Sequence, residues 1–276
     1  MTGPLGIVAG AGSLPRRLVE TCRESGRGAF VVAIEGQTDP ETVAGADHLW
    51  IRMGQSERAI RALREAGAKE LVLVGAVKRP SMTELRPDGL TFKFLARIGF
   101  NSLGDDGLLG AVVKGLEAEG FTLRGVEEFL HDLLAAEGCF GRHRPDEAAW
   151  RDIRRGIAVV RAMGAADVGQ ATVIQDGLVL GVEALEGTDA LLARCGPLRR
   201  AGPGGVLVKL RKPGQERRAD LPTIGVATVE GAAAAGLRGI AVEAGGTLVV
   251  DAPAVTNAAD RAGLFLVGIK TDAVPS

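Results

Sequence analysis

The sequence predicts an α/β protein made of two α/β domains, the N-terminal one Rossmann-like, with the active-site cleft between them. Three observations lead to this fold class. Strand-sized apolar runs alternate with segments of helical periodicity in the first 75 residues, and the same alternation returns beyond residue 170. A polar stretch punctuated by glycine, Glu137–Pro145, separates the two halves. We therefore expect a domain at residues 1–135, a linker at 136–145 and a C-terminal catalytic domain at 146–276.

The elements of the first domain follow from short buried runs and from the residues that begin and end helices. Pro15 suits the first turn of a helix, and Gly26 and Gly67 suit positions just past a helix end. A strand–helix–strand order is typical of a parallel sheet with helices on its faces. Strands are expected at Leu5–Ala9, Ala29–Ile34, Asp47–Ile51 and Glu70–Val74, and helices over Leu14–Ser25 and Ser56–Ala66.

The remaining elements are less regularly spaced. Up to residue 165 we expect a short strand at Phe121–Leu123 and helices over Leu90–Ile98, Asp106–Glu119, Val126–Leu134 and Asp146–Met163. Beyond it, the helices expected are Thr188–Arg194, Thr228–Ala235 and Val255–Ala262. The strands expected there are Ala171–Gln175, Leu178–Ala184, Gly205–Leu210, Gly239–Val242, Thr247–Val250 and Leu264–Ile269.

Composition and charge exclude several classes of protein. The 33 Lys and Arg residues nearly balance the 34 Asp and Glu residues, which argues against a general nucleic-acid binder. Cys22, Cys139 and Cys195 lie too far apart in sequence for a zinc motif or a disulfide framework, and no apolar run approaches the ~20 residues of a membrane span. The N-terminus lacks the basic region of a signal peptide, so we expect a cytoplasmic protein. With 40 glycines and no tyrosine, the chain favours close backbone approach to a ligand over aromatic stacking.

The turn after the first expected strand is the first candidate site. Gly10, Gly12 and Ser13 precede a helix, where backbone N–H groups can bind phosphate. A nicotinamide cofactor would need a third glycine at position 15, which is Pro15, although Glu35 could bind a ribose. An ordinary turn of an α/β fold remains the competing interpretation.

Charged residues follow two other expected elements. Lys78 and Arg79 come after a buried strand, so we expect them at the same sheet edge as the glycine turn, where they suit an anionic ligand or form a solvated pair. Asp105 and Asp106 open a helix, where they either favour the helix dipole or bind a divalent metal. A third group, at the end of a strand, contains Glu183, Glu186, Thr188 and Asp189, and helix capping explains only part of it.

The most specific candidate is the loop that follows the expected strand at Gly205–Leu210. Lysine and arginine neutralise phosphate oxygens, while an aspartate can bind a metal ion or orient a water. A charged surface hairpin is the alternative. The polar residues of this loop are Lys212, Gln215, Arg217, Arg218 and Asp220.

The usual nucleophile and nucleotide motifs are absent from the sequence. It contains no GxSxG elbow and no GxxxxGK[ST] loop, and His48, His131 and His143 show no metal spacing. Carboxylates and cations therefore carry the chemistry, which indicates metal-assisted phosphoryl or pyrophosphate chemistry. A nicotinamide-dependent reductase and a non-catalytic sugar-nucleotide or lipid-binding protein remain alternatives.

Taken together, the motifs resemble a known family. IVAGAGSLP, GDDGLL, EALEGTDALL and KPGQERRADLPTIGVATV, in this order, are similar to the UDP-2,3-diacylglucosamine pyrophosphatases of lipid A biosynthesis that are unrelated to the calcineurin-like phosphoesterases. The similarity runs from about Leu5 to Ile269.

The resemblance implies a reaction, a cofactor and an assembly. Hydrolysis of UDP-2,3-diacylglucosamine gives UMP and 2,3-diacylglucosamine 1-phosphate (lipid X), and it depends on Mg²⁺ or another divalent metal. A homodimer with at most peripheral contact with the inner face of the cytoplasmic membrane is expected. The motif matches the family's aspartate to Asp220, which we expect to be essential. Lys212, Arg217 or Arg218 would stabilise charge on the phosphate oxygens as catalytic cations, as in other phosphoryl transfers. Candidate metal ligands are Asp105, Asp106, Asp189 and Asp220, and candidate substrate-binding residues are Gly10, Gly12, Ser13, Lys78, Arg79, Thr188 and Gln215.

Overall fold

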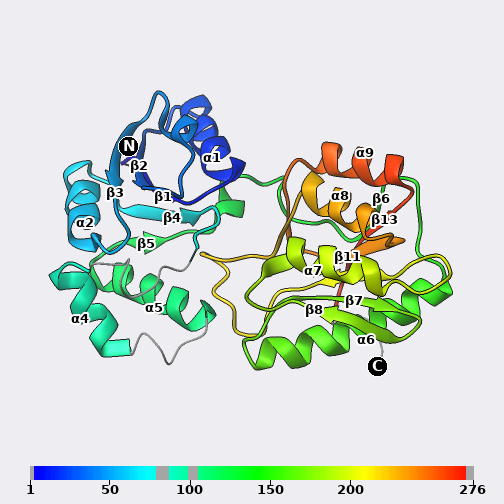
Figure 1. Cartoon of the computed structure of the whole chain (residues 1–276). Coiled ribbons are helices and arrows are strands. Elements are labelled where there is room, and N and C mark those ends of the chain that lie inside the picture. The colour runs from blue at the N-terminus through cyan, green and yellow to red at the C-terminus, as the bar shows by residue number, and fades with distance from the viewer. Residues whose placement is uncertain (1–2, 79–86, 99–104, 272–276) are drawn as a thin grey trace. The chain divides into compact units, whose positions relative to one another are not determined.

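The computed structural model of the chain describes residues 3–78, 87–98 and 105–271 (Figure 1). The chain divides into two compact units. Unit 1 comprises Met1–His131 together with Glu216–Asp220, and unit 2 comprises Asp132–Gln215 and Leu221–Ser276. Five residues of the charged loop thus belong to unit 1, although the chain on both sides of them belongs to unit 2. The units are described one at a time.

Unit 1 contains a parallel sheet in the order β3-β2-β1-β4-β5. Because the chain first adds strands on one side of β1 and then on the other, the strand order reverses between β1 and β4, as in Rossmann folds. The expected Rossmann-like first domain is therefore confirmed. The strands are β1 (Leu5–Ala9), β2 (Ala29–Ile34), β3 (Asp47–Ile51), β4 (Glu70–Val74) and β5 (Thr122–Leu123).

Helices cover this sheet because its strands are apolar on both faces. Val31, Val32 and Ala33 are consecutive in β2 and all are fully buried. Ile60 and Leu63 of α2 and Val113 of α5 pack in one cluster with residues of the sheet. The helices are α1 (Ser13–Glu24), α2 (Ser56–Glu65), α4 (Gly89–Ile98) and α5 (Asp105–Ala118), with short 3₁₀ turns η1 (Pro40–Val43) and η2 (Val126–Glu128).

Unit 2 is built on a mixed sheet in the order β6-β13-β11-β9-β7-β8. Strands β9, β11 and β13 are parallel, whereas β6, β7 and β8 pair antiparallel with their neighbours. The strands are β6 (Gly138–Phe140), β7 (Ala171–Gln175), β8 (Leu178–Val182), β9 (Val206–Lys209), β11 (Gly239–Glu243) and β13 (Phe265–Ile269). A separate parallel pair joins β10 (Thr223–Ile224) to β12 (Leu248–Val249).

Two apolar clusters follow from the alternation of side chains along β9. Val206 and Val208 pack with α6 (Glu147–Ala165), while Leu207 packs in the cluster of α7, α8 and α9. These helices are α7 (Gly187–Cys195), α8 (Val226–Ala234) and α9 (Ala252–Ala262), and a short 3₁₀ turn, η3 (Gly196–Leu198), follows α7. The second domain is therefore also α/β, as expected.

A buried carboxylate fixes the hairpin between β7 and β8. Asp152 of α6 is only 4% exposed, and its two oxygens accept hydrogen bonds from the backbone N–H groups of Asp176 (3.2 Å) and Gly177 (2.7 Å). Both turn residues have positive φ, 53° and 74°, as a two-residue type I′ hairpin requires. Asp152 therefore supports the turn, and neither of these two hydrogen bonds reaches a candidate motif.

Two expectations for the middle of the chain differ from the structure. The helix expected over Val126–Leu134 is only the 3₁₀ turn η2, because helical periodicity in a short segment does not guarantee a second turn. The stretch expected to be a linker contains β6, which pairs with β13 at the sheet edge. The glycines and charged residues of this stretch are typical of a loop, so the three-residue strand gives no signal in the sequence. The domain limits themselves stay a prediction.

Candidate functional site

In unit 1, two of the predicted segments lie side by side at the point where the strand order reverses. The backbones after β1 and β4 form an isolated bridge between Ala11 and Ala76, with N–H···O distances of 2.7 and 3.0 Å. The N–H of Gly10 donates to the carbonyl of Val74 at 2.8 Å. The carboxyl ends of β1 and β4 therefore carry one joined pair of loops, where ligands of such folds usually bind.

Two glycines are required by this loop contact itself. A Cβ on Gly10 would lie 2.5 Å from the carbonyl oxygen of Ala76, and one on Gly75 would lie 2.7 Å from that of Ala11. Gly75 also has a φ of 96°. These positions make room for neighbouring backbone, and the N–H groups of Gly10 and Ala11 are already used. Gly10 therefore makes room for the neighbouring loop, and its role as a phosphate contact stays a prediction.

The start of α1 is the more open part of this edge. Gly12 has a φ of 95° with nothing near its missing side chain, and Gly12 and Ser13 are exposed. The first N–H groups of a helix have no partner within the helix. Lys78 is also exposed, and its backbone N–H donates to Gln37 Oε1 at 3.2 Å. Arg79 lies outside the described residues.

In unit 2, the acidic group after β8 separates into different roles. Glu183 is 5% exposed, and Thr188 at the start of α7 donates to its Oε1 at 2.5 Å. The Thr188 oxygen accepts from Lys209 Nζ at 2.8 Å. Glu186 instead pairs with Arg194 at 2.8 Å, and Asp189 is exposed. Thr188, a predicted binding residue, thus belongs to a buried network.

Sequence reasoning missed Lys209, although one signal was present. It is the charged residue of the otherwise apolar strand VLVK, and it is 6% exposed. A lysine in a strand is usually interpreted as a solvent-facing residue, because buried lysines are rare.

The turn after β9 holds two further predicted residues. Pro213 and Gly214, with a φ of 78° at the glycine, form a turn in which the N–H of Gln215 donates to the carbonyl of Lys212 at 3.2 Å. Gln215 Oε1 in turn accepts from the N–H of Lys212 at 3.1 Å. The Lys212 ammonium lies 2.7 Å from Asp167 Oδ1, and its side chain is only 9% exposed. Lys212 and Gln215 therefore stabilise the turn.

The next five residues, Glu216–Asp220, are attached to unit 1 by Arg218. Its guanidinium binds both oxygens of Glu216, at 2.9 and 2.8 Å, and Glu117 of α5 at 2.6 Å. The N–H groups of Ala219 and Asp220 donate to the carbonyl of Glu216, at 3.1 and 3.0 Å, and Ala219 packs against the unit 1 core. Asp220 is half-buried and Arg217 is exposed.

Ion pairing in this segment shifts the pKa values of Glu216 and Arg218. The hydrogen bond to Arg218 lowers the pKa of Glu216 below its ordinary value, against a smaller opposing effect of burial. The same pairing, first with Glu216 and then with Glu117, raises the pKa of Arg218. Because the folded-state pKa of Glu216 is lowered, its stabilising contribution is complete above the unfolded pKa of about 4.3 and is lost as the pH falls through the lowered value.

The four predicted metal ligands are not tested by the structure. Asp105 and Asp106 are the first residues of α5, but their side chains lie outside the described part of the chain. Asp189 belongs to unit 2 and Asp220 to unit 1. Among the residues that are described, no group of three or more His, Cys, Asp or Glu side chains could hold a metal ion. The described side chains alone therefore do not complete a metal site.

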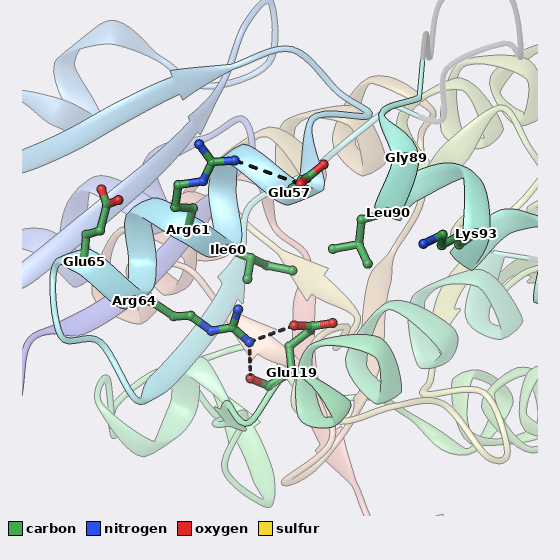
Figure 2. A pocket seen from close by; sticks show the side chains of 9 residues that line it. All are labelled: Glu57, Ile60, Arg61, Arg64, Glu65, Gly89, Leu90, Lys93 and Glu119. Atoms are coloured by element: carbon green, nitrogen blue, oxygen red, sulfur yellow. Dashed lines mark hydrogen bonds and ion pairs between the residues drawn. The ribbon is translucent and has the colours of Figure 1, made fainter.

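Two surface hollows of unit 1 contain none of the predicted site residues. Figure 2 shows a hollow of about 470 Å³ in unit 1, between Ile60 and Arg64 of α2 and Leu90 and Lys93 of α4. Its rim is neutralised by ion pairs such as Arg64 with Glu119, at 2.7 Å. A second hollow of about 630 Å³ lies along α1 and η1.

Comparison with protein families identifies both halves of the chain. Residues 4–133 match the family model described as the LpxI N-terminal domain, and residues 136–267 match that of the LpxI C-terminal domain.

The chain belongs to the LpxI family.

A curated relative supports the same family. The UDP-2,3-diacylglucosamine pyrophosphatase LpxI of Caulobacter vibrioides is 42% identical over 274 residues, which span 96% of this chain and 97% of the relative. The resemblance inferred from the sequence motifs is therefore confirmed.

Two solved structures show a distant likeness to this LpxI family member. The Bordetella bronchiseptica enzyme WbmG, in complex with NAD and UDP, is 14% identical and matches 100% of this chain and 84% of its own, with a TM-score of 0.37. The biotin carboxylase subunit of pyruvate carboxylase is 15% identical and matches 63% of this chain and 35% of its own, with a TM-score of 0.27. Neither likeness is close enough to inform the fold or the chemistry.

The attachment by Arg218 gives a testable prediction. In Arg218→Met, the carboxylates of Glu216 and Glu117 lose their shared cation, so we expect the Ala219 and Asp220 amides to exchange hydrogen about tenfold faster. The measurement is hydrogen–deuterium exchange of the full chain at neutral pH. Arg64→Met is the control, since it breaks the ion pair with Glu119 without touching the segment. Unchanged exchange at Ala219 and Asp220 in Arg218→Met would contradict the prediction.

Proposed function

We propose that this chain hydrolyses the pyrophosphate bond of UDP-2,3-diacylglucosamine, giving UMP and 2,3-diacylglucosamine 1-phosphate for lipid A biosynthesis. The observation that carries the proposal is the similarity, along nearly the whole chain, to a curated enzyme of that name at 42% identity. The sequence-level expectation of a hydrolase acting on a phosphorus anhydride agrees with it. The competing nicotinamide-dependent reductase finds no support in this family, and Pro15 interrupts the required glycine pattern.

The reaction needs a group that directs water and cations that neutralise charge. A pyrophosphate diester carries two negative charges that repel an incoming hydroxide, so positive groups lower the barrier. We assign to Asp220 the role of orienting the attacking water or binding the metal ion. Of the two predicted catalytic cations, Arg217 is exposed, whereas Lys212 is paired with Asp167. Both remain candidates for contact with phosphate oxygens.

Substrate contacts are proposed for the open positions of the predicted set. In unit 1 these are Gly12, Ser13 and Lys78, which combine the N-terminus of α1 with a cation at the same sheet edge. In unit 2, the partly buried Thr188 hydroxyl is already bonded to Glu183 and Lys209, which supports an indirect role. Gln215 uses its amide oxygen to hold the turn, which supports an indirect role. Arg79 remains a candidate from the sequence alone.

A divalent metal is proposed on chemical grounds. Carboxylate oxygens are the ligands that Mg²⁺ prefers, and the predicted set consists of carboxylates. When bound, such an ion polarises phosphate oxygens and lowers the pKa of a coordinated water. A homodimer and peripheral membrane contact are also proposed from the family resemblance. No helix in the described ranges is long and apolar enough to cross a bilayer.

The role of Asp220 can be tested with an isosteric change. Asp220→Asn removes the charge and keeps the shape, so we expect kcat to fall by at least about 10²-fold while substrate binding persists. UMP release and substrate affinity are measured on the same preparations. Asp251→Asn is the matched control, because Asp251 caps α9 (Asp251 Oδ1 to Ala254 N, 3.1 Å) and asparagine caps equally well. Turnover close to wild type in Asp220→Asn would sink the assignment.

Metal dependence gives a separate prediction. Treatment with a chelator is expected to stop UMP release, and added Mg²⁺ is expected to restore it, because the metal supplies charge that the cations alone do not. Rates are measured before chelation, after it and after readdition of metal. Full activity in excess chelator would contradict the proposed cofactor but would leave the hydrolytic function intact. Binding of the substrate without release of UMP under any condition would instead favour the non-catalytic alternative.

A further inference from the structure

The side chain of Lys209 lies at the carboxyl end of β9 and is 6% exposed. The three residues before it, Val206–Val208, are fully buried apolar side chains. Burying an ammonium in such surroundings is costly unless hydrogen bonds compensate. Side chains alternate along a strand, so Lys209 points to the face of Leu207, where α7 packs.

Hydrogen bonds of Lys209 define the direction of a short proton-donor chain. Its Nζ donates to Thr188 Oγ1 at 2.8 Å and to the carbonyl of Thr223 at 3.0 Å. Thr188 then donates to Glu183 Oε1. An ammonium only donates and a carboxylate only accepts, so the one hydroxyl proton of Thr188 must point to Glu183. The second Glu183 oxygen accepts from the N–H of Gln170 at 3.1 Å, which fixes the carboxylate.

These bonds connect two motifs that are distant in sequence. Thr188 belongs to EGTD, and Thr223 lies three residues after Asp220 in DLPT. The peptide that follows Asp220 is held at two consecutive carbonyls, since Pro222 accepts from the N–H of Leu248 at 2.7 Å and Thr223 accepts from Lys209. Lys209 thus fixes both the start of α7 and the backbone leading away from Asp220, and all these bonds lie within unit 2.

Stability alone does not account for a charge at this position. Replacing a buried charged group and its partners by apolar side chains is often neutral or stabilising. If the side chain at position 209 only had to pack in the apolar core, an aliphatic residue like its neighbours would therefore be sufficient. The hydrogen bonds of Lys209 are directional and reach both motifs. This favours a role in fixing the positions of Thr188 and Thr223.

We propose that Lys209 is a positioning residue for the pyrophosphatase reaction, holding the Thr188 hydroxyl and the Thr223 carbonyl in one fixed arrangement. This inference rests on the proposed function. Lys209 acts through Thr188 and through the backbone after Asp220, so its loss affects the chemical step more than binding. A displacement of reacting groups by about 1 Å can cost on the order of 100-fold in rate.

Variants of the full chain test the proposal by steady-state kinetics with UDP-2,3-diacylglucosamine. Lys209→Met keeps the unbranched side chain without the ammonium, and we expect kcat to fall about 30- to 100-fold with KM changed less than about threefold. Thr188→Val is expected to lower kcat about tenfold, whereas Thr188→Ser, which retains the hydroxyl, stays within about threefold of wild type. The double variant Lys209→Met/Thr188→Val is expected to be no slower than the slower single variant, since both changes break one network.

Asp152→Ala is the control for general destabilisation. Asp152 is a buried charged residue of the same unit that holds only the β7–β8 turn among the bonds described above. This variant is expected to melt about 5 °C lower than wild type with an unchanged kcat. Lys209→Met is expected to lose turnover even well below its own melting temperature, where the variant is folded.

Several outcomes would overturn the positioning role. One is a wild-type kcat in Lys209→Met. Another is a double variant whose fold-loss of kcat equals the product of the fold-losses in the two single variants. Equal loss of kcat in Asp152→Ala would also overturn it, because destabilisation would then explain the effect. If Lys209→Met does not fold, equal kcat values for Thr188→Val and Thr188→Ser still contradict the proposal. A wild-type chain that releases no UMP contradicts the proposed function itself.

Discussion

Parallel strands end at the same edge of a sheet, and this constraint places most of the polar groups discussed above. In unit 1 it brings the backbones after β1 and β4 into contact through the Ala11–Ala76 bridge. In unit 2 it leaves Lys209 at the end of β9, where its ammonium reaches α7 and β10. The contacts at both edges need special residues. Glycine at positions 10 and 75 permits close backbone approach, and a network of hydrogen bonds compensates the buried charge.

Two positive charges of the most specific motif hold the loop in place. Lys212 is paired with Asp167, and Arg218 is shared by Glu216 and Glu117. These bonds fix the chain on both sides of Arg217, which is exposed. A loop rich in cations is therefore not a set of equivalent phosphate ligands, since two of its positive charges already have carboxylate partners. Electrostatic catalysis depends on such preorganisation, because groups that are held in place need not reorganise during the reaction.

Much of the fold could be predicted because apolar runs and helix-ending glycines are local signals. The strand at Ala29–Ile34 was expected within exact limits. Pairings between distant residues leave no such signal. Lys212 and Asp167 are 45 residues apart, and the pattern around Lys209 is that of an ordinary strand. The glycine turn after β1 was recognised as a candidate phosphate site, whereas the close contact of Gly10 with the loop after β4 could not be predicted. The motif at Asp220 was found by resemblance to a family, since spacing alone does not distinguish a catalytic loop from a charged hairpin.

We propose that this chain cleaves a pyrophosphate bond of a lipid-linked sugar nucleotide. Phosphorus-31 NMR of UDP-2,3-diacylglucosamine during incubation with the wild-type chain and Mg²⁺ tests it most directly. We expect the two coupled pyrophosphate signals to disappear while two phosphomonoester signals grow in equal amounts, one from UMP and one from the sugar 1-phosphate. Persistence of the pyrophosphate signals would contradict it. Release of intact UDP would contradict it as well, because the bond broken would then be the one to the sugar.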